Sequence, residues 1–321
     1  MPGRPAAGRL RRWTAVLLAA WAAGAQGQSG APGVEPLAVS QVAPGVYVQF
    51  GQQDEWLPRN GGNVSNIGFI VGSRCVAVID TGGSVELGRR LRAAVARATP
   101  LPVCYVINTH AHPDHLLGNA AFVERPGQPV FVAHAKLAAA LAARERYYLN
   151  ALERDFGQTP ERAVLVYPSL AVDQTTELEL GGRTLVLRAW PTAHTDHDLT
   201  VYDPQTRTLL LGDLLFVGHM PVLDGNLRGW LAVMAEFERM DVKLAVPGHG
   251  PASADWPGVL APQRQYLTAL QRETRAAIKA GTTIDRAVEQ VGREAAGPWL
   301  LGETFHRRNV TAAYAELEWE D

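Results

Sequence analysis

The ten residues 106–115, VINTHAHPDH, place three histidines and one aspartate directly after an apolar run. His110 and His112 are two positions apart, so an extended loop would present both imidazoles on the same side. The proline that follows favours a helix start, and the first turn would carry Asp114 and His115 toward a second point. Imidazole nitrogens with one carboxylate oxygen suit zinc and similar cations rather than calcium. The stretch therefore predicts a metal centre at the end of a buried strand.

Three further candidate ligands follow at wide intervals, each at the end of an apolar run. They lie in the segments AHTD (193–196), LLGDL (210–214) and VPGHG (246–250). Alone, each is equally typical of a loop histidine or a capping aspartate. Together with the first cluster they supply seven nitrogen or oxygen ligands, which is more than one tetrahedral zinc ion needs. The complete candidate set is His110, His112, Asp114, His115, His194, Asp213 and His249.

The composition is that of a globular protein. The 321 residues are 47% hydrophobic and 19% charged, which excludes a disordered chain. The net charge of −2 gives no general attraction to nucleic acid, so we expect no nucleic-acid partner. The two cysteines, Cys75 and Cys104, lie near the starts of neighbouring predicted strands, where a bridge is geometrically possible. Our default interpretation is two buried, small, apolar side chains.

Short β-type runs alternate with helical stretches, which predicts an α/β protein whose sheets are covered by helices. Strands are expected at 46–50, 67–71, 75–79, 103–107, 130–133, 184–189, 199–202, 208–211 and 244–246. Helices are expected at 85–98, 135–156, 227–240, 263–280, 284–291 and about 303–318.

The first 27 residues have the pattern of an export signal. Four arginines precede an apolar run over residues 13–23, and small residues follow, with cleavage expected after Ala25 or Gly27. The run is shorter than the roughly 18 apolar residues that span a bilayer, so we expect no stable membrane span after processing. An uncleaved membrane tether is the alternative, and the Arg11-Arg12 pair leaves the export route open. Either way, we expect a periplasmic protein.

The order of the candidate ligands resembles the metallo-β-lactamase superfamily over roughly residues 42–253. The shared pattern is His-x-His-x-Asp-His, then a histidine, a Gly-Asp after a strand, and a final Gly-His. The resemblance implies an αββα sandwich with two zinc ions at one edge of the sheets. It implies a first zinc on His110, His112 and His194, a second on Asp114, His115 and His249, and Asp213 as the bridge. Residues 28–41 would form a flexible lead-in, and 254–321 a C-terminal helical extension packed on the domain.

Within that superfamily, four segments are most similar to the quinoprotein relay system zinc metallohydrolases. They are NVSNIGF (63–69), AHTD (193–196), GDLLF (212–216) and HRRNV (306–310). Members of this group are exported and are associated with quinone-cofactor dehydrogenases. The resemblance therefore implies a periplasmic quinoprotein dehydrogenase as a partner, whereas the substrate of the group is poorly defined.

The expected reaction is hydrolysis of an acyl compound of the ester, thioester or lactone class. Two zinc ions lower the pKa of bound water to about 7 and share a hydroxide that attacks the acyl carbon. Asp114 would be both a ligand and the catalytic residue that orients the nucleophile. Asp80 would hydrogen-bond a ligand histidine from outside the metal shell, with a turn aspartate at a strand end as the alternative. His219 could face the substrate, and a structural role is the alternative.

Three other functions stay open at this stage. The first is a β-lactamase proper, against which Asp213 counts because those enzymes usually lack an aspartate at the bridging position. The second is iron chemistry on sulfur compounds, as in persulfide dioxygenases, which metal identity would decide because zinc has no redox chemistry. The third is a non-catalytic accessory that binds a metal or cofactor, against which the complete ligand set counts. The sequence leaves the oligomeric state open.

Overall fold

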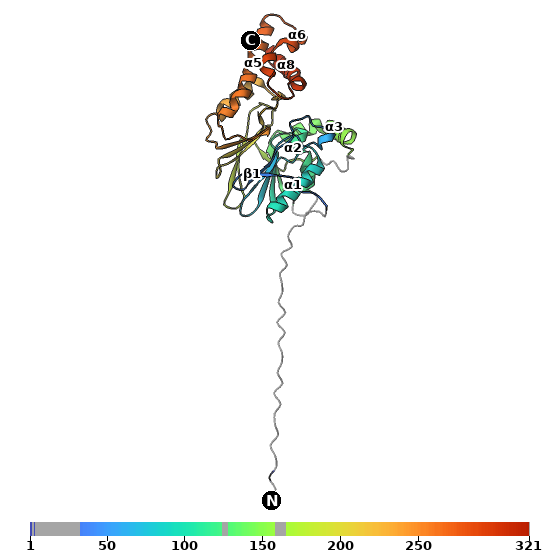
Figure 1. Cartoon of the computed structure of the whole chain (residues 1–321), viewed down its shortest axis with the longest axis vertical. Helices are drawn as coiled ribbons and strands as arrows, with labels where there is room; N and C mark the ends of the chain where they lie inside the picture. Colours follow the sequence, from blue (N-terminus) through green and yellow to red (C-terminus); the bar gives the residue numbers. More distant parts are fainter. Residues whose placement is uncertain (2, 4–32, 124–127, 158–164, 321) are drawn as a thin grey trace.

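Two mixed β-sheets stack face to face, with helices on their outer faces (Figure 1). The computed structural model describes residues 1, 3, 33–123, 128–157 and 165–320. The predicted export segment lies, apart from residues 1 and 3, outside the described residues. Within the described part of the chain, no helix is both long and apolar enough to cross a bilayer. The architecture is the expected αββα sandwich with additional C-terminal helices.

The first sheet has seven strands in sequence order, antiparallel from β1 to β4 and parallel from β4 to β7. The strands are β1 (Ser40–Ala43), β2 (Val46–Gln49), β3 (Ile67–Val71), β4 (Val76–Ile79), β5 (Val103–Ile107), β6 (Val130–His134) and β7 (Leu170–Val172). The second sheet has the order β12-β11-β10-β9-β8. Its strands are β8 (Thr175–Glu179), β9 (Thr184–Ala189), β10 (Leu199–Asp203), β11 (Thr208–Phe216) and β12 (Leu244–His249).

Alternating side chains of the central strands enter two different cores. In β4, Ala77 and Ile79 face the second sheet, whereas Val76 and Val78 pack under a helix. This alternation follows from the period of two in a strand. Because both faces of these strands are buried, their sequences read as continuous apolar runs. Each fully buried Val, Leu or Ile side chain contributes roughly 1.5–3 kcal/mol to the free energy of unfolding. Burial on both faces therefore holds these strands firmly in place, together with the residues at their ends.

Helices cover the outer faces of both sheets. On the first sheet, α1 (Val85–Ala98) packs Leu87, Leu91 and Val95, the predicted helical spacing, and Ser84 caps its first turn. The other elements of this half are α2 (Pro113–Leu116), α3 (Leu137–Phe156) and the 3-10 helices η1 (Pro58–Asn60) and η2 (Leu117–Phe122). On the second sheet lie α4 (Leu227–Phe237), η3 (Gly258–Leu260), α5 (Ala261–Lys279), α6 (Ile284–Gln290), α7 (Arg293–Ala296) and α8 (Gly302–Leu317).

The C-terminal helices α5 to α8 share one apolar core with the second sheet. Leu209 and Leu211 of β11 pack in the same cluster as Leu267 of α5 and Val310 of α8. Figure 1 shows α5, α6 and α8 gathered at one end of the molecule, next to the C-terminus. This extension therefore reaches the edge of the sandwich beside which β11 and β12 end.

The expected strands and helices are found within a few residues, with instructive differences. Strand β11 continues to Phe216, whereas the sequence predicted an end at residue 211. Gly212 does not end the strand: it adopts φ +52° and is accommodated as a bulge, after which the pairing with β12 resumes. A Cβ at Gly212 would lie 2.6 Å from Thr109 Cβ, so only glycine permits this close approach. The short strands β1, β7 and β8 were not expected, and β1 begins at Ser40, inside the stretch expected as a lead-in.

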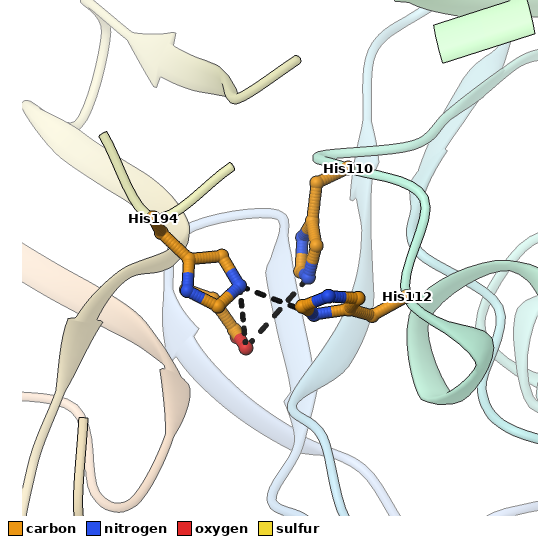
Figure 2. Close-up of side chains that lie close together, drawn as sticks. His110, His112 and His194 are labelled. Atoms are coloured by element: carbon orange, nitrogen blue, oxygen red, sulfur yellow. Dashed lines mark hydrogen bonds and ion pairs between the residues drawn. The ribbon is translucent and has the colours of Figure 1, made fainter. Parts of the chain in front are cut away.

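Strand ends from both sheets meet at one edge of the sandwich. Strand β5 leads into the loop that carries His110 and His112, and the loop after β9 brings His194 toward them from the second sheet. Figure 2 shows the three imidazoles facing a common point from these two sides. The fold thus joins residues more than 80 positions apart, as the 3.1 Å separation of His194 Nε2 and His112 Nδ1 demonstrates.

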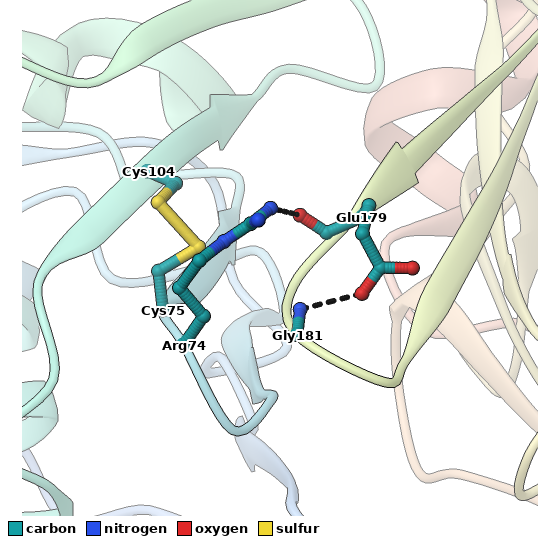
Figure 3. The surroundings of a disulfide bond; sticks show 5 residues. All are labelled: Arg74, Cys75, Cys104, Glu179 and Gly181. Carbon is teal, nitrogen blue, oxygen red and sulfur yellow. Dashed lines mark hydrogen bonds between the residues drawn. A yellow bond between two sulfur atoms is a disulfide. The ribbon is translucent and has the colours of Figure 1, made fainter.

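The two cysteines form a disulfide, so the default interpretation of two separate apolar side chains was wrong (Figure 3). Cys75 immediately precedes β4, and Cys104 is the second residue of β5, the parallel neighbour of β4. The Cα atoms of the two cysteines are therefore only 5.8 Å apart. That separation lies within the normal range for a bridge. Beside the bridge, Arg74 Nη2 donates a hydrogen bond of 2.8 Å to the carbonyl of Glu179 in β8. This corner therefore links the first sheet to the second.

Candidate metal centre

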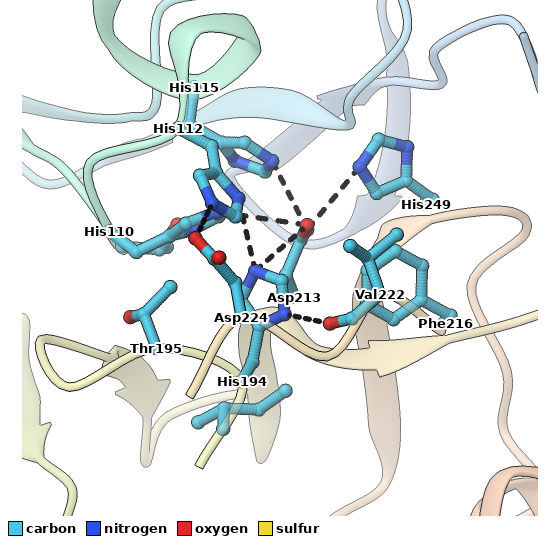
Figure 4. A network of polar contacts seen from close by, with 12 residues as sticks. His110, His112, His115, His194, Thr195, Asp213, Phe216, Val222, Asp224 and His249 are labelled. Carbon is cyan, nitrogen blue, oxygen red and sulfur yellow. Dashed lines mark hydrogen bonds and ion pairs between the residues drawn. The ribbon is translucent and has the colours of Figure 1, made fainter. Parts of the chain in front are cut away.

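Seven polar side chains converge at the edge where the two sheets meet. Figure 4 labels all of them except Asp114. The first sheet supplies His110 and His112 from the loop after β5, and Asp114 and His115 from α2. The second sheet supplies His194 from the loop after β9, Asp213 from β11 and His249 from the end of β12. The structure thus brings together every ligand candidate that the sequence indicated.

The first group comprises His110, His112, His194 and Asp213, whose candidate ligand atoms lie within 4.8 Å of one another. His194 Nε2 lies 3.1 Å from His112 Nδ1 and 3.5 Å from Asp213 Oδ2. His110 Nε2 lies 3.7 Å from the same oxygen of Asp213. Three imidazoles and one carboxylate oxygen therefore surround one point, and this donor set matches that of a four-coordinate zinc site.

The second group comprises Asp114, His115 and His249, again with ligand atoms within 4.8 Å. Asp114 Oδ2 lies 3.5 Å from His115 Nε2 and 3.4 Å from His249 Nε2. Both imidazoles also face Asp213 Oδ1, at 3.1 and 3.4 Å respectively. Asp213 therefore directs Oδ2 toward the first group and Oδ1 toward the second. Gly248 leaves room for this carboxylate, because a Cβ there would collide with Asp213 Oδ1.

The protein holds the outer nitrogen of each histidine in the first group. Thr109 Oγ1 lies 3.1 Å from His110 Nδ1, and the carbonyl of Val222 accepts a hydrogen bond of 2.6 Å from His194 Nδ1. His112 is turned the other way, because its Nε2 lies 3.0 Å from Asp224 Oδ2 while Nδ1 faces the centre. Such outer partners fix the tautomer and the orientation of a metal-binding imidazole.

The second group is held in the same manner. Asp80 Oδ2 accepts a hydrogen bond of 2.8 Å from His115 Nδ1, which confirms the predicted role of Asp80. Asp80 has φ +53°, a conformation that is unfavourable for most residues, and two hydrogen bonds from Thr109 at 2.8 and 2.7 Å keep it in place. The carbonyl of Val64 accepts from His249 Nδ1 at 3.0 Å. The Nε2 atoms of His115 and His249 thus point toward the centre, where they can bind a cation.

Unpaired polar atoms at the centre fit a pair of cations. Among the described residues, His110 Nε2, His115 Nε2 and Asp213 Oδ1 are fully buried and form no hydrogen bond, although the last two lie 3.1 Å apart as an ion pair. A buried polar atom without a partner costs roughly 1–3 kcal/mol, so three of them in one place call for a ligand. Imidazole and carboxylate donors suit borderline divalent cations such as zinc. The residues present therefore fit a dinuclear metal centre.

The two groups differ in the protonation states that they favour. In the first group, burial lowers the pKa of His194 to about 3 and also lowers the pKa of His110 well below its usual value. Burial would lower the pKa of His249 as well, but Asp213 and Asp114 outweigh it and raise that pKa to about 9. Burial raises the pKa of Asp114, but His115 and His249 outweigh it and lower that pKa to about 2.

The sequence matches the profile of one known protein family. The profile described as the Metallo-beta-lactamase superfamily matches residues 60–249, more than half of the chain. The chain belongs to the metallo-beta-lactamase superfamily. No curated relative matches the sequence. Membership of this superfamily agrees with the two groups of histidine and aspartate side chains that could hold metal ions.

Several solved structures have the same fold. A double mutant of the sec-alkyl sulfatase PisA1 superposes with a TM-score of 0.69 at 17% identity, over 88% of this chain and 51% of that chain. The chain therefore spans about half the length of that sulfatase. A metallo-beta-lactamase from Pontibacter korlensis superposes with a TM-score of 0.58 at 22% identity, over 72% of this chain and 99% of that chain. At these identities the likeness shows the fold alone.

The candidate metal centre of this superfamily member opens into a cavity of about 490 Å³. Asp114, Asp213, His112 and His249 are among the residues that line it. His219 also lines the cavity, with its ring centroid 4.8 Å from that of His249 and its Nδ1 2.8 Å from the carbonyl of Met220. His219 is therefore part of the cavity wall, as the sequence interpretation allowed.

Several residues of the superfamily site gave no sequence signal. Asp224 contacts His112, yet it lies in the irregular segment between β11 and α4, where an aspartate is unremarkable. The carbonyl of Val222 could not be recognised at all, since every residue has one. Arg144 of α3 and Arg308 of α8 reach the cavity from distant parts of the chain. In the sequence, HRRNV (306–310) contributes to the resemblance to the quinoprotein relay metallohydrolases, which assigns no role to its residues.

Helix α8 braces the loop that carries Val222 and Asp224. Asn309 is fully buried, and its side chain donates to the carbonyl of Pro221 at 2.6 Å and accepts from the amide of Leu223 at 2.9 Å. Those two bonds flank Val222, whose carbonyl accepts from His194. The C-terminal extension therefore holds a backbone group on which the first ligand group depends.

Proposed function

We propose that the chain is an exported dinuclear zinc hydrolase that acts on esters, thioesters or lactones. The observation that carries this proposal is the position of Asp213, which directs one carboxylate oxygen into each of two buried ligand groups. Two zinc ions bound there would supply Lewis acidity and a water nucleophile with a pKa near 7. The family membership supports hydrolysis in general, and the substrate class is our inference from this centre.

The protein's own groups support this reaction in distinct ways. His110 and His194 are neutral at pH 7 because burial lowers the pKa of each, so they add no positive charge and can bind a cation through nitrogen. Asp114 stays ionised, and its Oδ2 lies at the cavity base, where it can orient a nucleophile and accept a proton. The backbone of Asp114 is fixed by Ser65, whose hydroxyl donates to its carbonyl at 2.5 Å.

Export is proposed from the sequence, and the disulfide supports it. The arginine-rich front and short apolar run of the first 27 residues have the order of a signal peptide. Disulfides persist in oxidising compartments such as the periplasm, which agrees with the Cys75–Cys104 bridge. Recovery of the protein from the periplasmic fraction with a new N-terminus at Gln26 or Gln28 is the expected result. Retention of the full chain in the cytoplasm would contradict it.

We also propose the partner that the sequence resemblance implies, a periplasmic quinoprotein dehydrogenase. The support is the similarity of four short segments, including HRRNV (306–310), to the quinoprotein relay metallohydrolases. The expected result is that deletion of the chain's gene lowers dehydrogenase activity in intact cells and that the wild-type chain restores it. Unchanged dehydrogenase activity after deletion would contradict the link.

The hydrolase proposal is tested with a substrate panel on zinc-loaded protein. The panel contains an aryl ester, a thioester, a lactone and a chromogenic cephalosporin, and we expect kcat/KM to be highest for one of the first three. Asp114→Ala should abolish that turnover, whereas Asp196→Ala should not, because Asp196 is an exposed aspartate whose ion pair with Lys136 is 3.8 Å long. Faster turnover of the cephalosporin would favour the β-lactamase alternative. If Asp114→Ala leaves the biological activity of the protein in cells intact, the catalytic interpretation is wrong and the accessory alternative is favoured.

A further inference from the structure

Two arginines from distant helices meet at one side of the cavity above the metal centre. Arg144 Nη2 of α3 donates to Asp224 Oδ2 at 3.0 Å, and Arg308 Nη2 of α8 donates to Asp224 Oδ1 at 3.1 Å. Asp224 in turn contacts His112, a member of the first ligand group. The guanidinium groups therefore lie one side chain away from a candidate metal ligand.

Both guanidinium groups keep donors for another partner. Each guanidinium has five N–H donors, and the contacts with Asp224 use one nitrogen of each arginine. The side chains of Arg144 and Arg308 are 35% and 54% exposed, and both line the cavity. One aspartate balances only one of the two positive charges. This pair thus presents a net positive charge and a forked set of donors, which match the geometry of an oxyanion.

The acidic residues on the cavity wall do not cancel this charge. Asp54 lines the cavity, but Arg59 holds it with two hydrogen bonds at 2.7 and 2.8 Å. Glu55 also lines the cavity and is exposed to solvent, where its charge is screened. Asp114 and Asp213 face the metal groups, whose cations would more than balance them. The arginine pair is therefore the cationic feature that a substrate meets beside the centre.

The cavity wall also carries several aromatic and aliphatic side chains. Phe305 of α8 lies with its ring centroid 5.6 Å from that of His219, and Phe216 stacks on His249 at 5.1 Å. Val222 and Tyr147 line the same cavity. A ligand that fits this wall has an apolar or aromatic body, with its reacting group at the metal base and a charged group at the arginines.

We propose that Arg144 and Arg308 bind an oxyanion group of the substrate, so that the enzyme acts on acyl compounds that carry a carboxylate or sulfonate on an apolar body. The assignment rests on the proposed function, since it names the substrate class of the same site. Arg308 makes the C-terminal extension a specificity element as well as a structural brace. The negative charge selects substrates, and the apolar wall places the acyl group over the centre.

The test uses compounds that the enzyme does not consume, so that binding is separated from turnover. Calorimetry on zinc-loaded protein compares para-acetamidobenzoate, para-acetamidobenzenesulfonate and the neutral para-acetamidobenzamide. We expect the carboxylate or the sulfonate to bind about tenfold more tightly than the neutral amide, a difference typical of a charged hydrogen-bonded contact. The stronger of the two anions identifies the preferred oxyanion. Equal binding of all three compounds, or no binding of either anion, would overturn the proposal.

Variants on one helix provide the matched comparison. Arg308→Gln should remove the roughly tenfold preference for the anion while leaving the zinc content and the affinity for the neutral amide unchanged, and Arg308→Lys should retain part of it. Arg307→Gln is the control, because Arg307 pairs with Glu289 and does not line this cavity. An unchanged preference in Arg308→Gln would contradict the proposal. Failure to hydrolyse matched esters would instead count against the proposed reaction and leave the binding result intact.

Discussion

The two ligand groups share Asp213 but differ in how the metal-free protein holds them. The first group consists of three imidazoles around one carboxylate oxygen, and burial keeps His110 and His194 neutral. In the second group the imidazoles of His115 and His249 lie beside two carboxylates, which raise the pKa of each imidazole despite its burial. The first group is therefore ready for a cation, whereas the second holds protons that a cation must displace.

Their outer supports also differ. The second group relies on Asp80 and Val64, which belong to or flank the first sheet. The first group relies on Thr109, which Asp80 also holds, and on Val222 and Asp224, in a loop that Asn309 of the C-terminal extension braces. The extension therefore supports the first group only, whereas the sandwich core supports the second group and His110 of the first. Variants that affect both groups, or mainly one of them, therefore test whether the two groups have separate supports.

Asp213→Ala should have the largest effect, because it removes an oxygen from each group at once. We expect kcat/KM for the best ester to fall by more than the roughly 10–100-fold that the loss of an outer partner costs. We also expect fewer than two tightly bound zinc ions per chain, measured by elemental analysis after gel filtration. Far-ultraviolet circular dichroism controls for folding. Two retained ions with full activity would show that the groups do not share this residue.

Asp80→Asn should weaken the second group more than the first. The substitution keeps the size of the side chain but removes the charge that faces His115 Nδ1 at 2.8 Å. We expect a loss of roughly 10–100-fold in affinity for one zinc ion. The loss for the other ion should be smaller, because Asp80 reaches the first group only through Thr109, which contacts His110. Competition with a chromophoric chelator measures both affinities. Equal weakening of the two ions would contradict the separation of the supports.

Asn309→Leu should weaken the first group instead, through the loop. The variant leaves the carbonyl of Pro221 and the amide of Leu223 without their side-chain partner, at a cost of roughly 1–3 kcal/mol in the free energy of unfolding. We expect about tenfold weaker binding of one zinc ion, by the same chelator competition. Thr311→Ala is the control on α8, since Thr311 is exposed. Unchanged zinc affinities in Asn309→Leu would show that Asn309 does not support the first ligand group.

The pH dependence of stability should distinguish metal-free from zinc-loaded protein. A pKa of His249 raised from 6.5 to about 9 contributes stability that is complete below pH 6.5 and is lost as the pH rises through 9. The Tm of chelator-treated protein should therefore fall between pH 6.5 and 9. Zinc binding releases these protons, so the zinc-loaded protein should not show this fall. Parallel Tm curves for the two forms would contradict the proton-holding second group.

Much of this site was predictable because its ligands follow strands whose apolar runs are continuous. The spacing of His110 and His112 and the glycines before Asp213 and His249 placed these residues at strand ends, and a family resemblance completed the set. Strand β8, TTELE, was missed because its exposed positions carry few apolar side chains. The bridge between Cys75 and Cys104 depends on the register of β4 and β5, which neither segment alone specifies.

The supports of the site were less accessible to sequence reasoning than its ligands. Asp80 was identified because it follows an apolar strand. Asp224 contacts His112, which is 112 positions away, and Asn309 contacts Pro221 and Leu223, which are 88 and 86 positions away. No local pattern encodes such contacts. The same holds for Arg144 and Arg308, whose common partner is Asp224. Local chemistry thus marks what binds the cation, whereas tertiary packing determines what holds and surrounds it.

The central claim is that two cation sites share Asp213, and anomalous diffraction from crystals of the zinc-loaded protein tests it most directly. The account predicts two peaks at the zinc absorption edge, one among His110, His112 and His194 and one among Asp114, His115 and His249, each within bonding distance of a different oxygen of Asp213. A single peak, or zinc bound away from these side chains, would contradict it.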